Sequence, residues 1–390
     1  MNVAQLSRSL AALAMLATAC THGAALETRP RVSTEFSFPT APAFEPLPRQ
    51  VVARGLLIPR GMEAVAPHEL LVAEAGTGAP DNATGGLTRL TDVNHDGDFD
   101  DDDERTTLLG GQPSRNVLQI VRRDEVFGMG GMATGQGRLL VSLAFFGGPS
   151  TIFEVEVERE RVSEWGSTHG NINDLTYDAA HDAWFGAAST TDEIVRLLPG
   201  GGAERVLKLP LLPNGQDAVP GYLKASPYSK ELLVTLFSGS PEGEEGGQGV
   251  ELVPRAGGII AVDPDSQRLR WLVRGLSVPT DLEVGPDGAL YVLELCDGLV
   301  DPIRTRAELF AKPGHGGFRR FSGRLLRIDL RTQRASVLAQ ELDTPTNLLL
   351  VDGALYVAQG MGTPGREIPG PNGIQQLDGF IERFELAGGR

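Results

Sequence analysis

Two stretches decide the fold: VPTDLEVGPDGALYVLELCDG at residues 278–298 and TPTNLLLVDGALYVAQGMG at residues 344–362. Each has a proline near its start, then a short alternating strand, a glycine-containing turn and a second apolar strand. A third clear copy, IPRGMEAVAPHELLVAEAG, covers residues 58–76. Repetition of this kind indicates one structural unit that is used several times along the chain.

Weaker copies extend the series to six units, which recur about every 50 to 65 residues. They cover residues 128–148, 171–190 and 219–239. Two further alternating strands follow the second strand of a unit, as in GGIIAVDP and LRWLVRGL. Four antiparallel strands repeated six times predict an all-β, six-bladed β-propeller. A doubly wound or barrel fold needs crossover helices, and helical periodicity is weak outside the N-terminus and residues 304–310.

The two ends of the repeat region complement each other. The last unit lacks one strand after GFIERFEL (residues 379–386), whereas the first unit is preceded by a spare strand, QVVARGL. We therefore expect Gln50–Leu56 to form the outer strand of the last blade and to close the ring. Residues 50–390 are then a single propeller domain.

The N-terminus predicts export. The apolar run Leu10–Ala19 follows Arg8 and is too short to cross a bilayer, so residues 1–19 are interpreted as a signal peptide. Cleavage by signal peptidase I after Ala17-Thr18-Ala19 and lipidation of Cys20 are both compatible with the pattern. The protein is expected to be secreted or to be a bacterial lipoprotein of the periplasm or outer membrane. Residues 20–49 contain several prolines and are predicted to be an extended tether.

Composition limits the partners. The formal net charge of −16 argues against nucleic acid or an anionic membrane as the main partner. The only cysteine besides Cys20 is Cys296, so disulfides are not expected to hold the fold together. We expect a monomer that binds a small molecule or carbohydrate.

The sequence resembles secreted bacterial propellers of the ScyD/ScyE type, which are related to NHL, strictosidine-synthase-like and SMP-30 propellers. The resemblance covers about residues 50–387 and rests on GLLIPRG, LLVAEAGTG, VPTDLEVGPDGALYVLEL and TPTNLLLVDGALYVAQG. It implies a six-bladed architecture and secretion, but no particular reaction.

An acidic stretch, TDVNHDGDFDDDDERTTLL, occupies residues 91–109. Its spacing fits the calcium-loop pattern D-x-[DN]-x-[DN]-G, in which alternate side chains of a tight turn converge on one ion. The predicted ligands are Asp92, Asn94, Asp96, Asp98, Asp100 and Asp103. Two departures are the short Asp103 where glutamate is usual, with Glu104 one residue late, and the lack of flanking helices. The alternative is a solvated acidic turn. In the repeat, the loop joins the third and fourth strands of the first blade, so we expect a structural calcium.

Ligands of propellers commonly bind where loops surround the central channel, at the face on which the inner strands begin. The polar residues predicted there are Arg60, Glu74, Asn173, Asp174, Asp281, Glu294 and Asn347. The sequence predicts a polar ring at this mouth and leaves open a second divalent metal held by it. Each residue taken singly could instead cap a turn or a strand end.

The loop of the fifth blade is long and basic in an acidic chain, which is typical of a binding loop. Its basic residues are Arg304, Arg306, Lys312, His315, Arg319, Arg320 and Arg324. An anionic ligand bound by residues such as Arg306, His315 and Arg319 is one explanation. Pairing with Glu242, Glu244 and Glu245 of the preceding loop is the other.

Catalytic motifs do not decide the function. G-x-S-x-G, Walker A, H-E-x-x-H and C-x-x-C are absent from the sequence. His169 and His315 are candidate bases of a quinoprotein sugar dehydrogenase, although histidines in glycine-containing loops commonly cap turns. We therefore predict a ligand-binding propeller. The alternative is an enzyme, either a metal-dependent lactonase or hydrolase of the SMP-30 type or a quinoprotein dehydrogenase, acting at the same face.

Overall fold

The computed structural model describes residues 35–78, 83–116, 125–144, 148–241, 251–299, 317–361, 366–370 and 373–386. The chain divides into two units, Met1–Ser33 and Thr34–Arg390. The first unit, with the predicted signal peptide and Cys20, lies outside the described residues. Everything below concerns the second unit.

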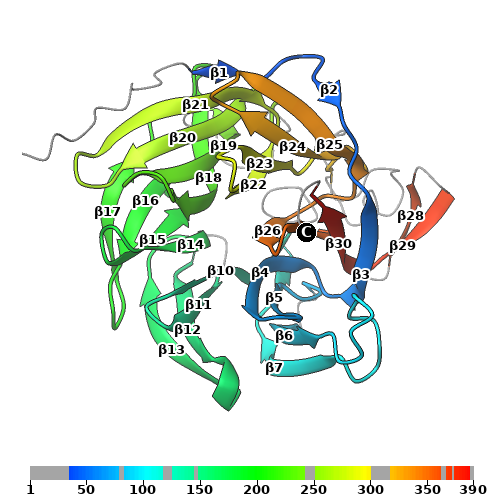
Figure 1. The fold of residues 1–390 in the computed structure, drawn as a ribbon. Helices are drawn as coiled ribbons and strands as arrows, with labels where there is room; N and C mark the ends of the chain where they lie inside the picture. The colour runs from blue at the N-terminus through cyan, green and yellow to red at the C-terminus, as the bar shows by residue number, and fades with distance from the viewer. Residues whose placement is uncertain are drawn as a thin grey trace, which may run out of the picture. The chain divides into compact units, whose positions relative to one another are not determined.

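Six antiparallel sheets surround a central axis, and each contains the four strands of one blade, as predicted (Figure 1). The first strand of each blade lines the axis. These inner strands are β4 (Pro59–Ala66), β10 (Met129–Gly135), β14 (Ile172–Asp178), β18 (Gln216–Ala225), β22 (Pro279–Val284) and β26 (Asn347–Val351). The second strands are β5 (Glu69–Glu74), β11 (Arg138–Leu143), β15 (Ala183–Ala188), β19 (Leu232–Pro241), β23 (Leu290–Glu294) and β27 (Ala354–Gln359).

The outer half of each blade completes the ring. The third strands are β6 (Gly85–Thr91), β12 (Ser150–Glu156), β16 (Glu193–Leu197), β20 (Gly257–Asp263), β24 (Gly323–Asp329) and β30 (Gly379–Glu385). The fourth strands are β7 (Arg105–Gln112), β13 (Arg161–Thr168), β17 (Ala203–Lys208), β21 (Arg268–Leu276), β25 (Arg334–Leu342) and β3 (Arg49–Leu56). The N-terminal β3 pairs antiparallel with β30 of the sixth blade, so the predicted ring closure is confirmed.

Apolar side chains hold neighbouring blades together. Between the fourth and fifth blades, Ile259 and Leu282 belong to one fully buried cluster with Val292. Between the sixth and first blades, Val52, Met62 and other side chains form a corresponding cluster. The second strands β5 and β23 are buried along their whole length, because each sheet packs against its neighbours with both faces.

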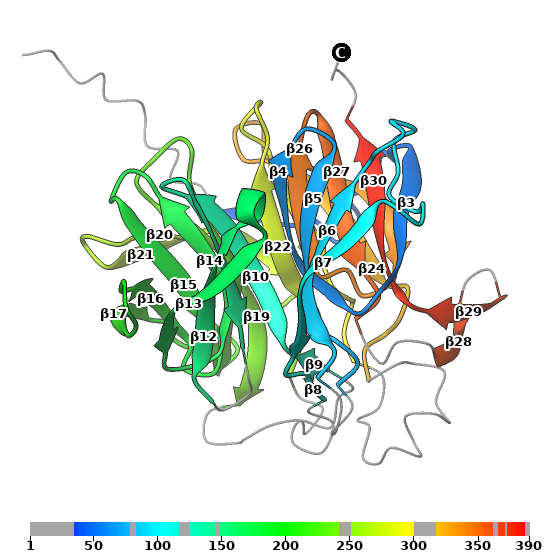
Figure 2. The ribbon, with the colours of Figure 1, turned by 90° about the horizontal axis from the view of Figure 1, so that it is seen from below.

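Strand direction defines two faces of the ring. We call the face where the inner strands begin the start face, and the face where they end the end face. Loops from second to third strands lie on the start face, and loops from third to fourth strands lie on the end face. In Figure 2 the hairpin of β28 (Arg366–Gly370) and β29 (Gly373–Leu377) lies towards the start face, and the cyan loop beside β3 lies towards the end face.

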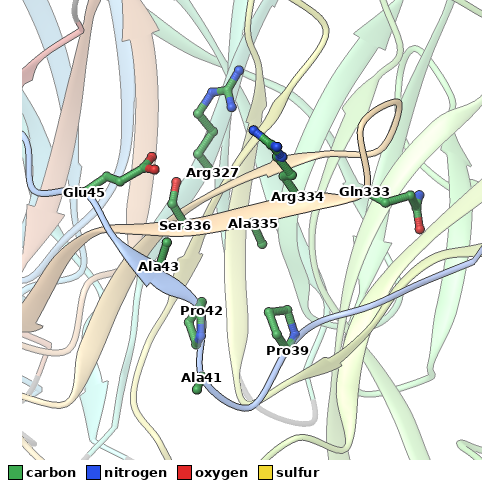
Figure 3. Close-up of a pocket in the computed structure, with 10 residues that line it drawn as sticks. All are labelled: Pro39, Ala41, Pro42, Ala43, Glu45, Arg327, Gln333, Arg334, Ala335 and Ser336. Carbon is green, nitrogen blue, oxygen red and sulfur yellow. The ribbon is translucent and has the colours of Figure 1, made fainter.

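The segment before β3 also packs on the propeller. Within the predicted tether, β1 (Phe36–Ser37) pairs parallel with β21, and β2 (Ala43–Phe44) pairs parallel with β25. Phe36 and Phe38 are buried against the fourth and fifth blades. Figure 3 shows the bend between β1 and β2, with Pro39 and Pro42 beside β25. Two blades are thus five-stranded, and their outer edges are covered at this segment.

Small elements complete the described chain. They are a hairpin of β8 (Arg115–Asn116) and β9 (Val126–Phe127) and one 3-10 turn, η1 (Val157–Arg159). Within the described ranges, no helix has the length and apolar character needed to cross a membrane.

Candidate functional site

Glu74 and Glu294, both predicted to be part of the polar ring, bond within their own blades. Each ends a second strand and accepts the backbone N–H of the residue 17 positions earlier: Leu57 N at 2.5 Å for Glu74 and Ser277 N at 2.7 Å for Glu294. Their second oxygens accept from the third strand of the blade, from the Thr88 hydroxyl for Glu74 and from Arg324 Nε at 2.7 Å for Glu294.

Gln359 repeats this arrangement in the sixth blade. Its Oε1 accepts from Asp343 N at 2.8 Å, and its Nε2 donates to Glu382 Oε2 at 2.5 Å. The recurring side chain at the end of the second strand is therefore buried and connects the backbone just before the inner strand to a side chain of the third strand. The sequence signal was its recurrence at one repeat position in three units.

The described arginines of the basic loop are paired with carboxylates. Arg319 Nη1 lies 3.1 Å from Asp297 Oδ2, Arg320 makes a buried two-pronged pair with Asp343, and Arg324 pairs with Glu294. These pairs lie within the fifth blade and its junction with the sixth. Arg306 and His315, together with Glu242, Glu244 and Glu245, lie outside the described residues.

The start face carries an apolar cluster where polar residues were predicted. Its buried members come from the first, second, fourth, fifth and sixth blades, so they meet at the centre of the ring. They are Ile58, Ala75, Val126, Leu252, Val278, Leu295, Cys296, Phe318 and Met361. Arg60 lies at its edge, donating from Nη1 to Val126 O at 3.0 Å. Among the described residues, the mouth on this face is thus mainly apolar.

One level deeper, the inner strands place a mixed ring around the axis. This ring is formed by Gly61, Gly131, Asp174, Tyr222, Asp281 and Asn347, which lie two positions after Pro59, Met129, Ile172, Pro220, Pro279 and Pro345. Five of the six inner strands have a β-bulge at this point. Bulges redirect side chains, which explains how strands otherwise packed against their neighbours present polar groups here.

Asp174, Asp281 and Asn347 bridge neighbouring blades. Asp174 Oδ2 accepts from Leu223 N of the fourth blade at 3.1 Å. Asp281 Oδ2 accepts from Asn347 Nδ2 and Leu348 N of the sixth blade, both at 2.7 Å. The structure therefore brings these three predicted residues into one polar layer. Asn173 is bonded locally, with Oδ1 accepting from Asn171 at 2.8 Å, and His169 lies exposed in the loop between β13 and β14.

Tyr222 crosses the channel. It projects from the fourth blade, and its hydroxyl donates to the carbonyl of Arg60 in the first blade at 2.9 Å. The first and fourth blades face each other across a six-bladed ring, so this bond spans the axis. Glycine at position 61 lets the inner strands of the first and second blades approach closely, since a Cβ there would lie 2.3 Å from Gly130 O. A ligand that enters from one face would meet this tyrosine.

Beyond Tyr222, towards the end face, the channel is charged. Glu63, Lys224 and Glu283 lie two residues further along their inner strands, and Lys224 Nζ is 2.9 Å from Glu283 Oε1. With Asp174 and Asp281 this makes four carboxyl groups around one ammonium group. Lys224 keeps 30% of its side chain exposed and Glu283 keeps 13%, so water reaches this layer.

The shared environment shifts the pKa values of these groups. Burial raises the pKa of Asp174 to about 7, and Lys224 only partly opposes this. Burial also raises the pKa of Asp281 and of Glu63. Burial lowers the pKa of Lys224, but the attraction of Glu283, Asp281 and Glu63 outweighs this and raises it. Asp174, Asp281 and Glu63 therefore hold their protons to higher pH than free carboxyl groups do.

Sequence reasoning missed Glu63, Lys224, Glu283 and Tyr222. Their signal was available: charged or aromatic residues two apart on strands predicted to line the axis, as in Asp281–Glu283 and Tyr222–Lys224. The search was confined to strand ends, where loops usually carry function.

The acidic loop joins β6 to β7 on the end face, as predicted. Its backbone folds around its own side chains: Gly97 N donates to Asp92 Oδ2 at 3.2 Å and Asp96 N donates to Asn94 Oδ1 at 2.8 Å. Asp98 N similarly donates to Asp96 Oδ1 at 3.2 Å. Asp92 is 4% exposed, and its Oδ1 is buried with no hydrogen-bond partner among the described residues. An orphaned buried carboxylate oxygen is what an ion-binding loop requires at its first position.

Two of the predicted calcium ligands, Asp100 and Asp103, are placed differently from the expectation. Asp103 is exposed, whereas Glu104 is 1% exposed and accepts from Val93 N at 3.0 Å and Asp101 N at 3.2 Å. Asp100 Oδ1 faces outward to the ring closure, where it accepts from Arg54 N at 2.8 Å. The loop also docks on β3 through Phe99 N, which donates to Val52 O at 2.7 Å. It is thus attached to the strand that closes the ring.

Convergent metal ligands are found at one place in the described chain. His68, Asp92 and His95 offer ligand atoms that all lie within 4.8 Å of one another. The channel carboxylates form no such group among the described residues.

Comparisons with known proteins give the fold. No known family matches the sequence, and no curated protein matches it. Among solved structures, a protein of unknown function from Bacteroides thetaiotaomicron has a TM-score of 0.52 at 12% identity, covering 86% of this chain and 75% of its own. Similarity at this level shows a shared fold alone.

Two further structures have lower scores and carry no argument. A putative glucose dehydrogenase from a Thermus species has a TM-score of 0.45 at 16% identity, covering 86% of this chain and 99% of its own. Virginiamycin B lyase from Staphylococcus aureus, solved with quinupristin, has a TM-score of 0.45 at 12% identity, covering 87% and 99%.

Proposed function

We propose that the protein is an exported, calcium-stabilised propeller that binds a small polar ligand in the charged layer of its central channel. Export rests on the N-terminal sequence, and the resemblance to ScyD/ScyE-type propellers agrees with it. The observation that carries the binding proposal is the layer of Glu63, Lys224 and Glu283, which lies above Asp174 and Asp281.

Fold stability does not explain why ionisable residues occupy this layer. Burying ionisable groups costs free energy, and apolar residues of similar volume would fill a channel at least as well. Four carboxyl groups facing one ammonium group leave acceptors that a ligand could use. Groups that suit them are amines and hydroxyls, because carboxylates accept hydrogen bonds from both.

Among the described residues, access to the charged layer is favoured from the end face. The apolar cluster around Phe318 occupies the start face, and Tyr222 spans the axis below it. The partial exposure of Lys224 and Glu283 favours access from the end face. This proposal moves the site away from the predicted mouth and replaces the anionic ligand, because the described arginines of the basic loop already have carboxylate partners.

The enzymatic alternative needs a channel metal or a set of redox residues. A channel metal would require several carboxylate oxygens within reach of one point, and the described residues supply that convergence at His68, Asp92 and His95 instead. Binding is therefore the function that the geometry supports best.

A proposed structural calcium in the acidic loop completes this function. The support is the buried, unpartnered Asp92 Oδ1 and the attachment of the loop to β3 through Phe99. Calcium would relieve repulsion among the loop carboxylates and fasten the strand that closes the ring. It takes no part in ligand binding.

Binding can be tested by titrating the protein with putrescine, glucosamine, glucose and citrate in a calorimeter. We expect an amine-bearing or hydroxyl-bearing probe to bind, and Glu283→Gln and Lys224→Met to change its affinity by about tenfold or more, the scale of a charge-assisted hydrogen bond. Glu231→Gln is the matched control, because Glu231 lies on the end face outside the channel and pairs with Arg270. Equal affinities for Glu283→Gln and Glu231→Gln, or a preference for citrate, would contradict the proposed site.

A further inference from the structure

The turn between β4 and β5 and the acidic loop bring two histidines and an aspartate together on the end face. His68 Nδ1 lies 3.5 Å from Asp92 Oδ2, and the rings of His68 and His95 meet edge to face with centroids 4.9 Å apart. The backbone ties the two loops at the same place, because Asp92 N donates to His68 O at 3.0 Å. The three side chains come from two separate segments, so their convergence is a product of the fold.

We propose that His68, His95 and Asp92 form a binding site for a divalent transition metal, with zinc as the best-fitting ion. Two imidazoles and one carboxylate are a ligand set that zinc, nickel and copper prefer, whereas calcium prefers oxygen ligands throughout. The site therefore prefers a different ion from the calcium loop, with which it shares Asp92.

The geometry is compatible with zinc after small rotations. Ligand atoms around a tetrahedral zinc lie about 3.3 Å apart, as follows from metal–nitrogen distances of about 2.0–2.1 Å. The His68–Asp92 distance of 3.5 Å is already close to this value, and all three ligand atoms lie within 4.8 Å. His68 keeps 58% of its side chain exposed and His95 is also exposed, so both rings can turn. Water would fill the fourth position.

Asp92 supplies a second, independent observation. This side chain is 4% exposed, and its Oδ1 has no hydrogen-bond partner among the described residues. Its other oxygen, Oδ2, accepts from Gly97 N and faces His68. Within the described chain, Asp92 thus has one oxygen without a partner and the other beside an imidazole. Its negative charge can therefore act on both the loop and the histidines.

The experiment is a zinc titration of the untagged protein, stripped with a chelator and measured with and without saturating calcium. We expect one zinc per chain with similar affinity in both conditions. His68→Ala and His95→Ala should each weaken binding by more than the roughly 10–100-fold that changes around a metal's ligands cost. His169→Ala is the matched control, because His169 is an exposed loop histidine elsewhere in the chain.

A spectroscopic readout separates ligation from a general effect on folding. Cobalt(II) in place of zinc should give the intense visible absorption of a tetrahedral site in the wild type and in His169→Ala, and lose it in His68→Ala. The proposal is overturned if zinc does not saturate at one site, if the three histidine variants bind alike, or if calcium abolishes zinc binding. Because the zinc titration is also run without calcium, it does not depend on whether calcium occupies the loop.

Discussion

The two faces of the propeller use carboxylates in opposite ways. On the start face, Glu74 and Glu294 are buried at strand ends, and backbone amides and third-strand side chains occupy their oxygens. Towards the end face, Glu63 and Glu283 share one lysine with two deeper aspartates. Residues of the same type are thus tied into the framework at one face and gathered around a single lysine towards the other.

The difference teaches that pairing, more than residue type or repeat position, decides what a buried acid can do. A carboxylate whose oxygens accept two or three good hydrogen bonds is part of the framework. Carboxyl groups that are buried around a single cation have raised pKa values, as at Glu63, Asp174 and Asp281, and perturbed groups of this kind cluster at functional sites.

The largest effect is expected from removing an apolar side chain at the start face. Phe318→Ala removes a side chain that is 1% exposed and should lower the free energy of unfolding by about 3–5 kcal/mol, because a cavity remains. Urea denaturation measures the loss. Phe44→Ala is the control, since Phe44 is 52% exposed and should cost little. Similar losses in the two variants would show that Phe318 is not packed in the apolar cluster.

The charged layer should make the free energy of unfolding depend on pH. Asp174 has a folded pKa of about 7, above its unfolded value of about 3.9, so the folded protein holds the extra proton between those values. Stability from this group is complete below about pH 4 and is lost as the pH rises towards 7, at no more than about 1.4 kcal/mol per pH unit.

Denaturant titrations between about pH 4.5 and pH 7.5 test this slope. Asp174→Asn should be flatter than the wild type across the range, because the amide cannot titrate. Asp352→Asn, which changes an exposed turn residue, should keep the wild-type slope. Parallel curves for all three proteins would refute a shared proton in the channel.

The smallest expected effect concerns the loop on the end face. Calcium held at about a hundred times its dissociation constant should add about 2.7 kcal/mol of stability, or a few degrees of melting temperature. A thermal melt with calcium and with chelator measures this, and the variant carrying Asp92→Ala and Asp96→Ala should not respond. If the chelator does not change the melting temperature of the wild type, the proposed calcium site is refuted. A variant that folds but loses ligand binding would show that the loop has a role in binding as well as in stability.

The candidate site shows where sequence reasoning reached its limit. Asp174, Asp281 and Asn347 were found because they follow the repeat at a fixed place. Glu74 and Glu294 follow it equally well, yet their partners lie in other strands of the same blade. Arg319 was predicted to bind an anionic ligand, but in the structure its Nη1 lies 3.1 Å from Asp297 Oδ2. A single sequence records the residues but not which partners their atoms meet.

By itself, the sequence determined the blade count, the four-stranded unit, the ring closure by Gln50–Leu56 and the position of the acidic loop on the end face. These follow from local patterns, since alternation, turns and repeats depend on neighbouring residues. Only the tertiary structure decided that Tyr222 spans the axis, that five blades contribute apolar side chains to one cluster at the start face, and that His68 meets His95. Those facts depend on contacts between segments far apart in the chain, and bulges and blade packing set such contacts in ways that sequence spacing does not encode.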